Sequence, residues 1–472
     1  MKHIKLYLFL MMIVSITLCS CMKNLDTAPQ TFQTNIDKFS DLQAALAAAY
    51  NGLKAEEYYG GNFLTPMAWS CLPDLMGDDF VEALESTGNW RQMAEWRYNT
   101  DEGIIAGAFA QAYRIIASAN DVLQNVNRFK SGTTEAGAGQ IQAQALALRA
   151  HCHFDLMRYF AQSYQRNSDS LGVPYITAFS PDNPLEARPA RNTVKQCYDS
   201  IYADLSEAQA LFDQYGDIDN NNRFYIDEMA IHAMLARINL YNGQYAEAEA
   251  EATIIIDHFP LANQLEFPEI WKDNSTAEIV WQVPSDQEMQ PGFATAGDNA
   301  PYRVANDFRD LVYSPAGGVR SHPDLIQTNI EGIGGVMRTL LYKYDGTKNF
   351  KVFRAGEMYL IRAESKYMQN MGEGLDDVNA LRDARGAATG TETGAGVWTA
   401  IMNERRLELI GEGHRWFDIK RTTRAITRNE CGSAGGTHSD ICSVGPDSRS
   451  WIWPIPFNEI NINSNLEQNP DY

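Results

Sequence analysis

The chain has 472 residues, of which 44% are hydrophobic and 11% aromatic, so it has enough apolar material for a sizeable core. Its formal net charge of -21 at pH 7 argues against a polyanionic partner such as nucleic acid or an anionic lipid surface. The composition is that of a globular protein, and neutral ligands suit its charge best.

The N-terminus has the pattern of a secretion signal. A short basic start precedes an apolar run from Leu6 to Leu18, and this run of about 13 residues is shorter than the roughly 20 that a spanning helix needs. The sequence Leu18-Cys19-Ser20-Cys21 resembles a bacterial lipobox with Cys21 as the lipidated residue. We expect a lipoprotein signal peptide over 1–20 and a lipidated, polar tether over 21–37. Ordinary signal cleavage beside an incidental cysteine is the alternative.

The body, residues 38–472, is expected to be a single domain dominated by helices. Long Ala-rich amphipathic stretches have the lengths typical of helices. They span Asp41–Glu56, Ala106–Arg128, Gly139–Tyr164 and Thr193–Tyr215. Alternation of apolar and polar residues is scarce, so the sequence predicts few short strands, of which Glu278–Val283 is one.

The segment from Ala230 to Pro260 has the pattern of a tetratricopeptide repeat. Small residues let two antiparallel helices approach each other, and Gly243 lies where the turn between them is needed. A second pair of helices, Val352–Gln369 and Leu375–Arg385, repeats the arrangement less closely. The pattern predicts an all-α scaffold, a tetratricopeptide-type superhelix, whose loops carry the function.

Loop-rich segments at about 58–100 and 262–350 are rich in Trp, Tyr, Gly, Asn and Pro, and we expect them to form the ligand-binding face. A further Gly-rich loop lies between Cys431 and Cys442, which could form a disulfide that closes it. That both are free thiols is the open alternative. Cys152 and Cys197 lie in helical patterns and fit buried thiols.

The stretch Asn403–Arg421 combines apolar residues at helical spacing with a high density of charge. We expect one helix, or two helices hinged at Gly411 and Gly413. Glu412–Arg415 and Asp418–Arg421 are expected to be ion pairs, because residues three apart share a helix face. Arg, Glu and Trp crowded in this way usually form a polar seam between packed helices.

No catalytic motif stands out along the chain. The patterns H-E-x-x-H, G-x-S-x-G and G-x-x-x-x-G-K are absent. His151 and His153 are two residues apart, which places them on different helix faces, so we interpret them as packing residues rather than metal ligands. Glu404, Glu408 or Asp418 could still form an acid/base pair, as in a secreted all-α glycoside hydrolase or lyase.

The order of motifs along the chain resembles the RagB/SusD family, the lipid-anchored nutrient-binding proteins of the Bacteroidetes outer membrane. The motifs are the lipobox at Cys21, A-L-R-A-H-C-H-F-D-L-M-R-Y-F from Ala147, the repeat described above, G-E-M-Y-L-I-R-A-E from Gly356, the stretch Asn403–Arg421, and W-P-I-P-F-N-E-I-N-I-N from Trp453. Asp471 departs from the Asn-Pro-Gly-Tyr with which the family usually ends.

The resemblance implies a binding protein and not an enzyme, with no metal and no cofactor. Members of this family look like lids over a SusC-like TonB-dependent transporter, held to the outer membrane by lipid and facing the cell exterior. They capture oligosaccharides or, in some cases, peptides and pass them inward. An oligopeptide-binding member is therefore an alternative, and a helical-repeat adhesion scaffold is a third hypothesis.

The family's starch-like ligands are bound by loops before the first repeat and in the irregular region of the second half. By position, the candidate ligand-binding residues are Asp78, Trp90, Arg91, Trp96 and Tyr302, with Tyr58 and Tyr59 in reserve. Aromatic faces stack on sugar rings while carboxylates and Arg bond the hydroxyls. Replacing Trp90 and Trp96 by Ala is expected to abolish binding and leave the melting temperature nearly unchanged.

Overall fold

The computed structural model describes residues 36–61, 67–84, 86–88, 90–178, 188–285, 300–332, 335–432 and 437–472. The expected signal peptide, Cys21 and most of the tether lie outside these ranges. Within them, no helix is both long enough and apolar enough to cross a bilayer.

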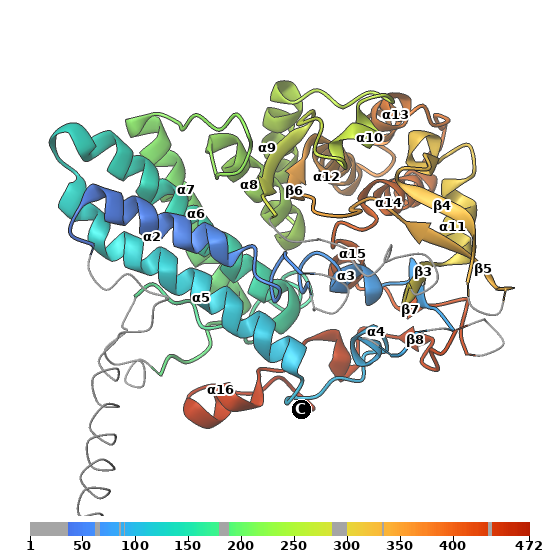
Figure 1. Ribbon diagram of the computed structural model, residues 1–472, viewed down its shortest axis with the longest axis horizontal. Coiled ribbons are helices and arrows are strands. Elements are labelled where there is room, and N and C mark those ends of the chain that lie inside the picture. The colour runs from blue at the N-terminus through green and yellow to red at the C-terminus, as the bar shows by residue number, and fades with distance from the viewer. Residues whose placement is uncertain are drawn as a thin grey trace, which may run out of the picture.

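Long helices packed side by side form the first half of the body (Figure 1). They are α2 (Phe39–Gly52), α5 (Gly103–Asn125), α6 (Glu135–Phe160) and α7 (Val194–Tyr215). Helix α6 contacts the other three, and each of its residues from 143 to 160 is buried, so it is the centre of this layer. Thr193 caps α7 by accepting a hydrogen bond from the backbone N–H of Gln196, and Gly216 follows the helix with φ 82°.

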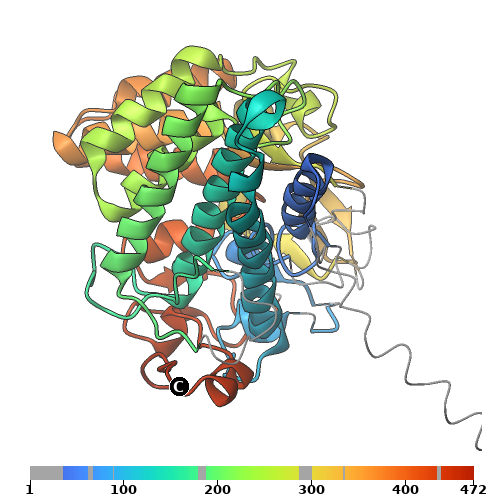
Figure 2. The same cartoon turned by 90° about the vertical axis from the view of Figure 1, so that its left-hand side faces the viewer.

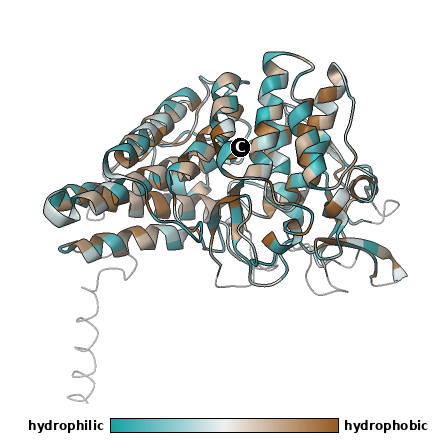
Figure 3. Cartoon of the chain, turned by 90° about the horizontal axis from the view of Figure 1, so that it is seen from above, coloured by the Kyte–Doolittle hydropathy of each residue, from teal (hydrophilic) through white to brown (hydrophobic). Residues whose placement is uncertain are grey.

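The predicted repeat is a pair of helices, α8 (Glu228–Asn242) and α9 (Tyr245–His258), with Gly243 between them at φ 84°. The second pair is α12 (Ala355–Gln369) and α13 (Leu375–Ala384). Helix α9 packs on α12, so the two pairs stack into one scaffold (Figures 1 and 2). Figure 3 shows hydrophobic and hydrophilic residues alternating along the helices, as packing of one face requires. The all-α scaffold is confirmed.

The strands of the described residues form four two-stranded antiparallel sheets. The pairs are β1 (Phe80–Glu82) with β3 (Tyr302–Val304), β2 (Ile279–Val283) with β6 (Phe350–Arg354), β4 (Ile326–Glu331) with β5 (Met337–Leu341), and β7 (Ile426–Thr427) with β8 (Ser443–Val444). The short helices are α3 (Leu72–Leu75), α4 (Arg91–Ala94), α10 (Phe267–Ile270), α11 (Asn306–Val312) and α16 (Phe457–Ile462). The predicted strand 278–283 corresponds to β2.

The charged stretch forms two helices, α14 (Ala395–Leu409) and α15 (Arg415–Arg421). The hinge lies where the sequence predicts it, because Gly411 and Gly413 both have φ 77°. The Asp418–Arg421 pair is present at 2.8 Å. The expected Glu412–Arg415 pair is wrong, because longer-range partners are better placed: Glu412 pairs with Lys343 and Arg354, while Arg415 pairs with Asp78.

The polar seam predicted for this stretch lies beneath α14. The Arg354 guanidinium donates to Glu412 at 2.7 Å and to Glu278 at 2.9 Å, and it also pairs with Glu408. Arg385 joins the same carboxylates, with Nη2 at 2.8 Å from Glu278 and from Glu408. All five side chains are at most 2% exposed, so water cannot solvate their charges. The ion pairs between them compensate these charges inside the core.

The C-terminal segment packs against the end of α6. The Trp453 ring stacks on Tyr159 with centroids 3.6 Å apart, and the Asn469 amide donates to the carbonyls of Phe160 at 3.0 Å and Trp453 at 2.7 Å. The Tyr472 hydroxyl donates to the Ile452 carbonyl at 3.1 Å. The last twenty residues therefore complete the packing of the end of α6.

Candidate functional site

The candidate residues lie around α3, α4 and the β1–β3 pair. Strand β1 belongs to the loop segment 58–100 and β3 to the segment 262–350, and Glu82 pairs with Tyr302 in their antiparallel register. Two segments that are more than two hundred residues apart in sequence therefore meet in one region, close to β7 and β8 (Figure 1).

Trp90 is held at the start of α4 in a left-handed backbone conformation, with φ 56°. A bulky residue seldom adopts this conformation, so the surrounding contacts must impose it. Its ring stacks on Tyr302 with an interplanar angle of 15° and centroids 6.5 Å apart. Trp90 is 6% exposed and Tyr302 is 1% exposed, so little of this pair reaches the surface.

Arg91 is the most accessible candidate, with 36% of its side chain exposed. Its Nε and Nη2 donate to the two carboxylate oxygens of Glu82 at 2.7 and 2.8 Å. This bidentate pair fixes the guanidinium plane and leaves Nη1 for another acceptor. The arrangement suits a donor that is aimed at a ligand hydroxyl.

Trp96 is buried below α4, with 4% of its surface exposed and φ 55°. Its indole N–H donates to the Met76 carbonyl at 3.1 Å, and the Arg428 guanidinium lies 4.3 Å from the ring centroid. Burial lowers the pKa of Arg428 to about 10. Because both tryptophans are buried, truncating them to Ala removes core packing worth about 3–5 kcal/mol each. The sequence-based expectation that Trp90→Ala and Trp96→Ala leave the melting temperature nearly unchanged therefore does not fit the structure, which predicts a lower melting temperature.

Asp78 forms a bidentate ion pair with Arg415, at 2.5 and 2.9 Å. Burial opposes ionisation of the carboxyl, but the Arg415 guanidinium outweighs it and lowers the pKa of Asp78 to about 2. Asp78 therefore stays ionised and joins the loop of α3 to α15. The neighbouring Asp74 accepts the backbone N–H groups of Gly413 and Arg415 at 2.9 and 3.0 Å, which joins the same elements a second time.

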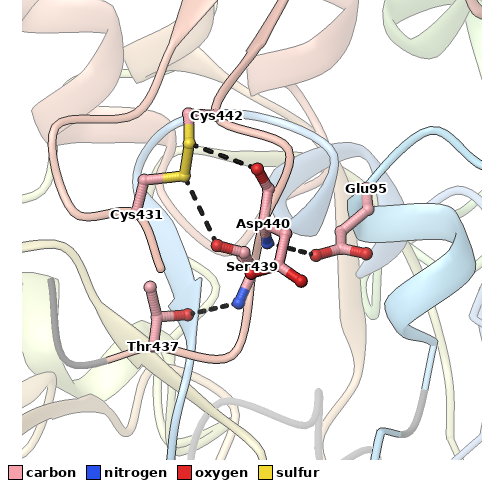
Figure 4. The surroundings of a disulfide bond; sticks show 6 residues. All are labelled: Glu95, Cys431, Thr437, Ser439, Asp440 and Cys442. Atoms are coloured by element: carbon pink, nitrogen blue, oxygen red, sulfur yellow. Dashed lines mark hydrogen bonds between the residues drawn. A yellow bond between two sulfur atoms is a disulfide. The ribbon is translucent and has the colours of Figure 1, made fainter. Parts of the chain in front are cut away.

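Cys431 and Cys442 form a disulfide at the root of the β7–β8 hairpin, with Cα atoms 5.6 Å apart (Figure 4). The closed loop reaches the candidate site: the backbone N–H of Asp440 donates to the buried Glu95 carboxylate at 2.8 Å, close to Trp96 in sequence. Of the other cysteines of the described residues, Cys152 and Cys197 are free thiols, and Cys71, Cys152 and Cys197 are all buried.

Tyr58 and Tyr59, the reserve residues, are fully packed. Their hydroxyls donate to Asp155 at 2.7 and 3.2 Å, and Tyr59 also contacts His151 at 2.8 Å. Burial lowers the pKa of His151 to about 4 and that of His153 to about 3, so both are neutral packing residues. No group of three His, Cys, Asp or Glu side chains within the described ranges could hold a metal ion.

The carboxylates of the charged stretch are all engaged by arginines. Glu404 pairs with Arg320 and Arg382, and Asp418 pairs with Arg405 and Arg421. Burial opposes ionisation of Asp418, but the two guanidinium groups hold its pKa far below the usual range. The pKa of Glu408 is also well below its ordinary value, because Arg385 and Arg354 outweigh the effect of burial. Neither carboxyl carries a proton that a general acid could donate.

Sequence reasoning missed the residues that hold the candidates in place. Glu82, Arg415 and Arg428 bond or cover them, and Glu95 ties the disulfide-closed loop to the same region. Only Arg415 carried a signal, because it lies in the charged stretch, although the sequence paired it with Glu412 and not with Asp78. The others are isolated charges whose role depends on contacts made by the folded chain.

Comparisons with known proteins agree with this architecture. The model described as SusD family matches residues 338–472, and the model described as starch-binding associating with outer membrane matches residues 23–240. SusD-like protein P2 of Formosa agariphila is 24% identical over 98% of this chain and 99% of its own length. The starch-binding protein SusD of Bacteroides thetaiotaomicron is 29% identical over 36% of this chain and 32% of its own.

Solved structures give the same result. The crystal structure of a SusD superfamily protein from Bacteroides thetaiotaomicron superimposes with a TM-score of 0.77 and 25% identity, covering 91% of this chain and 99% of that one. The overall fold is thus shared with this solved structure. The chain belongs to the SusD/RagB family.

Proposed function

We propose that the protein binds oligosaccharides at the cell surface without cleaving them and delivers them to a SusC-like TonB-dependent transporter in the outer membrane. The starch-binding description of the family model over residues 23–240, and the name of the SusD relative, support a carbohydrate as the ligand. The acidic net charge of -21 supports a neutral one.

The observation that carries the proposal is the junction of the two loop segments. There Trp90, stacked on Tyr302, is followed in the chain by Arg91, whose guanidinium is fixed by Glu82 and partly exposed. Aromatic rings and an oriented donor in one region match a sugar ring, which has an apolar face and a rim of hydroxyls. Asp78 pairs with Arg415 and Trp96 packs against Arg428, so we assign these two candidates to the support of the junction.

Binding without catalysis is supported by the state of the acidic residues. A glycosidase needs one carboxylic acid that can give up a proton and one free carboxylate across the bond. Glu408 and Asp418 are ionised, buried and held by arginines, so they offer neither.

Calorimetry of a panel of neutral oligosaccharides, with the soluble form that begins at residue 22, tests the proposal. We expect saturable binding and recovery of the intact sugar by chromatography. Arg91→Ala should weaken binding about tenfold, because one charge-assisted hydrogen bond is lost. Arg309→Ala is the matched control, since Arg309 is also 36% exposed and pairs with its neighbour Asp310. Shortened sugars would refute the binding role, and binding of peptides alone would change the ligand class.

The membrane part of the proposal rests on Cys21. Acyl chains on this residue would hold the body at the membrane, each buried methylene contributing about 0.8 kcal/mol. In the native host, Cys21→Ser should therefore move the protein from the membrane fraction to the soluble fraction and reduce its co-purification with the transporter. Unchanged membrane association would contradict lipidation at this position.

A further inference from the structure

A second concave surface lies on the repeat scaffold, and no residue of α3, α4 or the β1–β3 pair lines it. It is a groove of about 470 Å³, a size within the usual range of small-ligand sites. Its lining comes from the residues after α6, the start of α9, the end of α12, the start of α14 and the residues after α15. None of the five candidate residues described above lines it.

One wall of the groove is aromatic. The rings of Tyr367 on α12 and Trp398 on α14 lie 5.5 Å apart at 35°. Both rings are partly buried, because they pack against a small apolar cluster of α12, α13 and α14. That cluster is formed by Ala363, Val378, Val397, Ile401 and Met402. The packing fixes both rings while they line the open groove.

Tyr245, at the start of α9, supplies a third ring. Its hydroxyl donates to the side-chain carbonyl of Gln165 at 3.1 Å, which sets the position of the ring. Three aromatic side chains in one groove provide the flat apolar surfaces against which ring-shaped ligands stack.

The polar lining is an ordered pair of charges. Arg421 donates to both carboxylate oxygens of Glu364, at 2.5 and 2.7 Å, and to Asp418 at 2.9 Å. The side chains of Arg421 and Glu364 are 4% and 2% exposed, so they are rigid parts of the groove. A carboxylate and a guanidinium fixed in this way present both acceptors and donors to hydroxyl groups.

The charges around the groove compensate each other. Glu364 and Asp418 balance Arg421, and at the edge Asp447 pairs with Arg166 at 2.5 Å. No uncompensated cation is present among the described lining residues to attract an anionic ligand. A neutral ligand with an apolar face and hydroxyl groups fits this lining better than a uronate, a sulfated sugar or a phosphate.

We propose that this groove is a second saccharide site, which binds a short neutral oligosaccharide by stacking on Tyr367, Trp398 and Tyr245 and by hydrogen bonds to the Arg421–Glu364 pair. The inference goes beyond the function proposed above, because each site could bind a sugar in the absence of the other.

A blocking substitution tests the groove without disturbing its packed wall. Met368 lines the groove and is 44% exposed, so Met368→Trp should fill the space at little cost to the fold. Met371→Trp is the matched control, because Met371 is 71% exposed, three residues further on and outside the lining. By calorimetry with neutral oligosaccharides, we expect M368W to weaken binding about tenfold or more and M371W to leave it unchanged.

The experiment is repeated in the Arg91→Ala protein so that the two sites are distinguished. Saccharide binding that remains in R91A and is lost in R91A with M368W supports the second site. If no neutral oligosaccharide distinguishes M368W from M371W, the second site is refuted, while weakening by R91A alone would leave the proposed function standing. If M368W affects only the binding of peptides, the assignment of a saccharide to the groove is wrong.

Discussion

Arg354 shows how one buried residue can determine the stability of this fold. It compensates Glu278, Glu408 and Glu412 at once, and it is 1% exposed. Arg354→Met would leave these carboxylates with fewer partners in the core, so we expect the free energy of unfolding to fall by about 3–5 kcal/mol. Urea unfolding measures the change.

Lys195→Met is the control, because Lys195 pairs with Asp199 on the surface, with 54% and 60% of the two side chains exposed. Exposed pairs of this kind add little to stability, so no measurable change is expected. Equal stability of the two variants would show that the buried network is not needed for the fold.

Asp74 should give the stability a pH dependence of its own. Burial raises its pKa from 3.8 to about 7, against the opposing effect of two backbone N–H groups. The folded protein holds this proton to higher pH than the unfolded chain does. The contribution to stability is therefore fully present below pH 3.8 and is lost as the pH rises through about 7.

Asp74→Asn should flatten the decline in unfolding free energy between pH 4 and pH 7, by up to about 4 kcal/mol. Urea unfolding at several pH values measures the slope, with Asp199→Asn, an exposed carboxyl, as the control. A profile of D74N that is parallel to the wild type would contradict the raised pKa.

At the scale of elements, the turn between α14 and α15 depends on Gly413. Its φ is 77°, and a Cβ atom there would lie 2.2 Å from the Trp69 carbonyl oxygen. Gly413→Ala should therefore lower the melting temperature, through about 1–3 kcal/mol of backbone strain plus the clash. Gly103→Ala at the start of α5 is the control, because nothing lies within 4 Å of a Cβ there. Similar melting of the two variants would mean that the turn can move.

The β7–β8 hairpin gives a second prediction at this scale. The soluble form should show three titratable thiols when unfolded without reductant and two more after reduction, as the thiols of Cys71, Cys152 and Cys197 and one disulfide require. Cys431→Ser with Cys442→Ser should make this loop the first site of proteolysis, because a closure worth about 3 kcal/mol in chain entropy is lost. Five thiols before reduction would show that the bond is absent.

The helices were the most predictable part of the fold, for a physical reason. Their packing faces repeat every turn, so α5, α6, α7 and both repeat pairs follow from the sequence. Their ends follow less well: the stretch expected at 41–56 is α2, Phe39–Gly52, which ends without a glycine in the cap.

The candidate site was predictable only as a region. Trp90 and Trp96 are covered by Tyr302 and Arg428, residues more than two hundred positions away, and no local pattern reports such contacts.

For the molecule as a whole, the distribution of charge predicts how ligand binding depends on salt. Many arginines are buried and paired, as Arg237 is with Glu357 and Arg421 with Glu364, while the chain carries a net charge of -21. The affinity for a neutral oligosaccharide should therefore change little between low and high ionic strength. Calorimetry at several salt concentrations measures this, and a steep loss of affinity with salt would indicate an anionic ligand instead.

The packing of residues 453–472 on α6 determines how well the protein tolerates loss of this segment. The Trp453 ring covers Tyr159, and the Asn469 amide satisfies the Phe160 carbonyl. Without these residues, an aromatic ring and a buried backbone carbonyl at the end of α6 would be left uncovered. Proteolytic removal of the segment would therefore turn part of the core into a sticky surface, so its loss should favour aggregation.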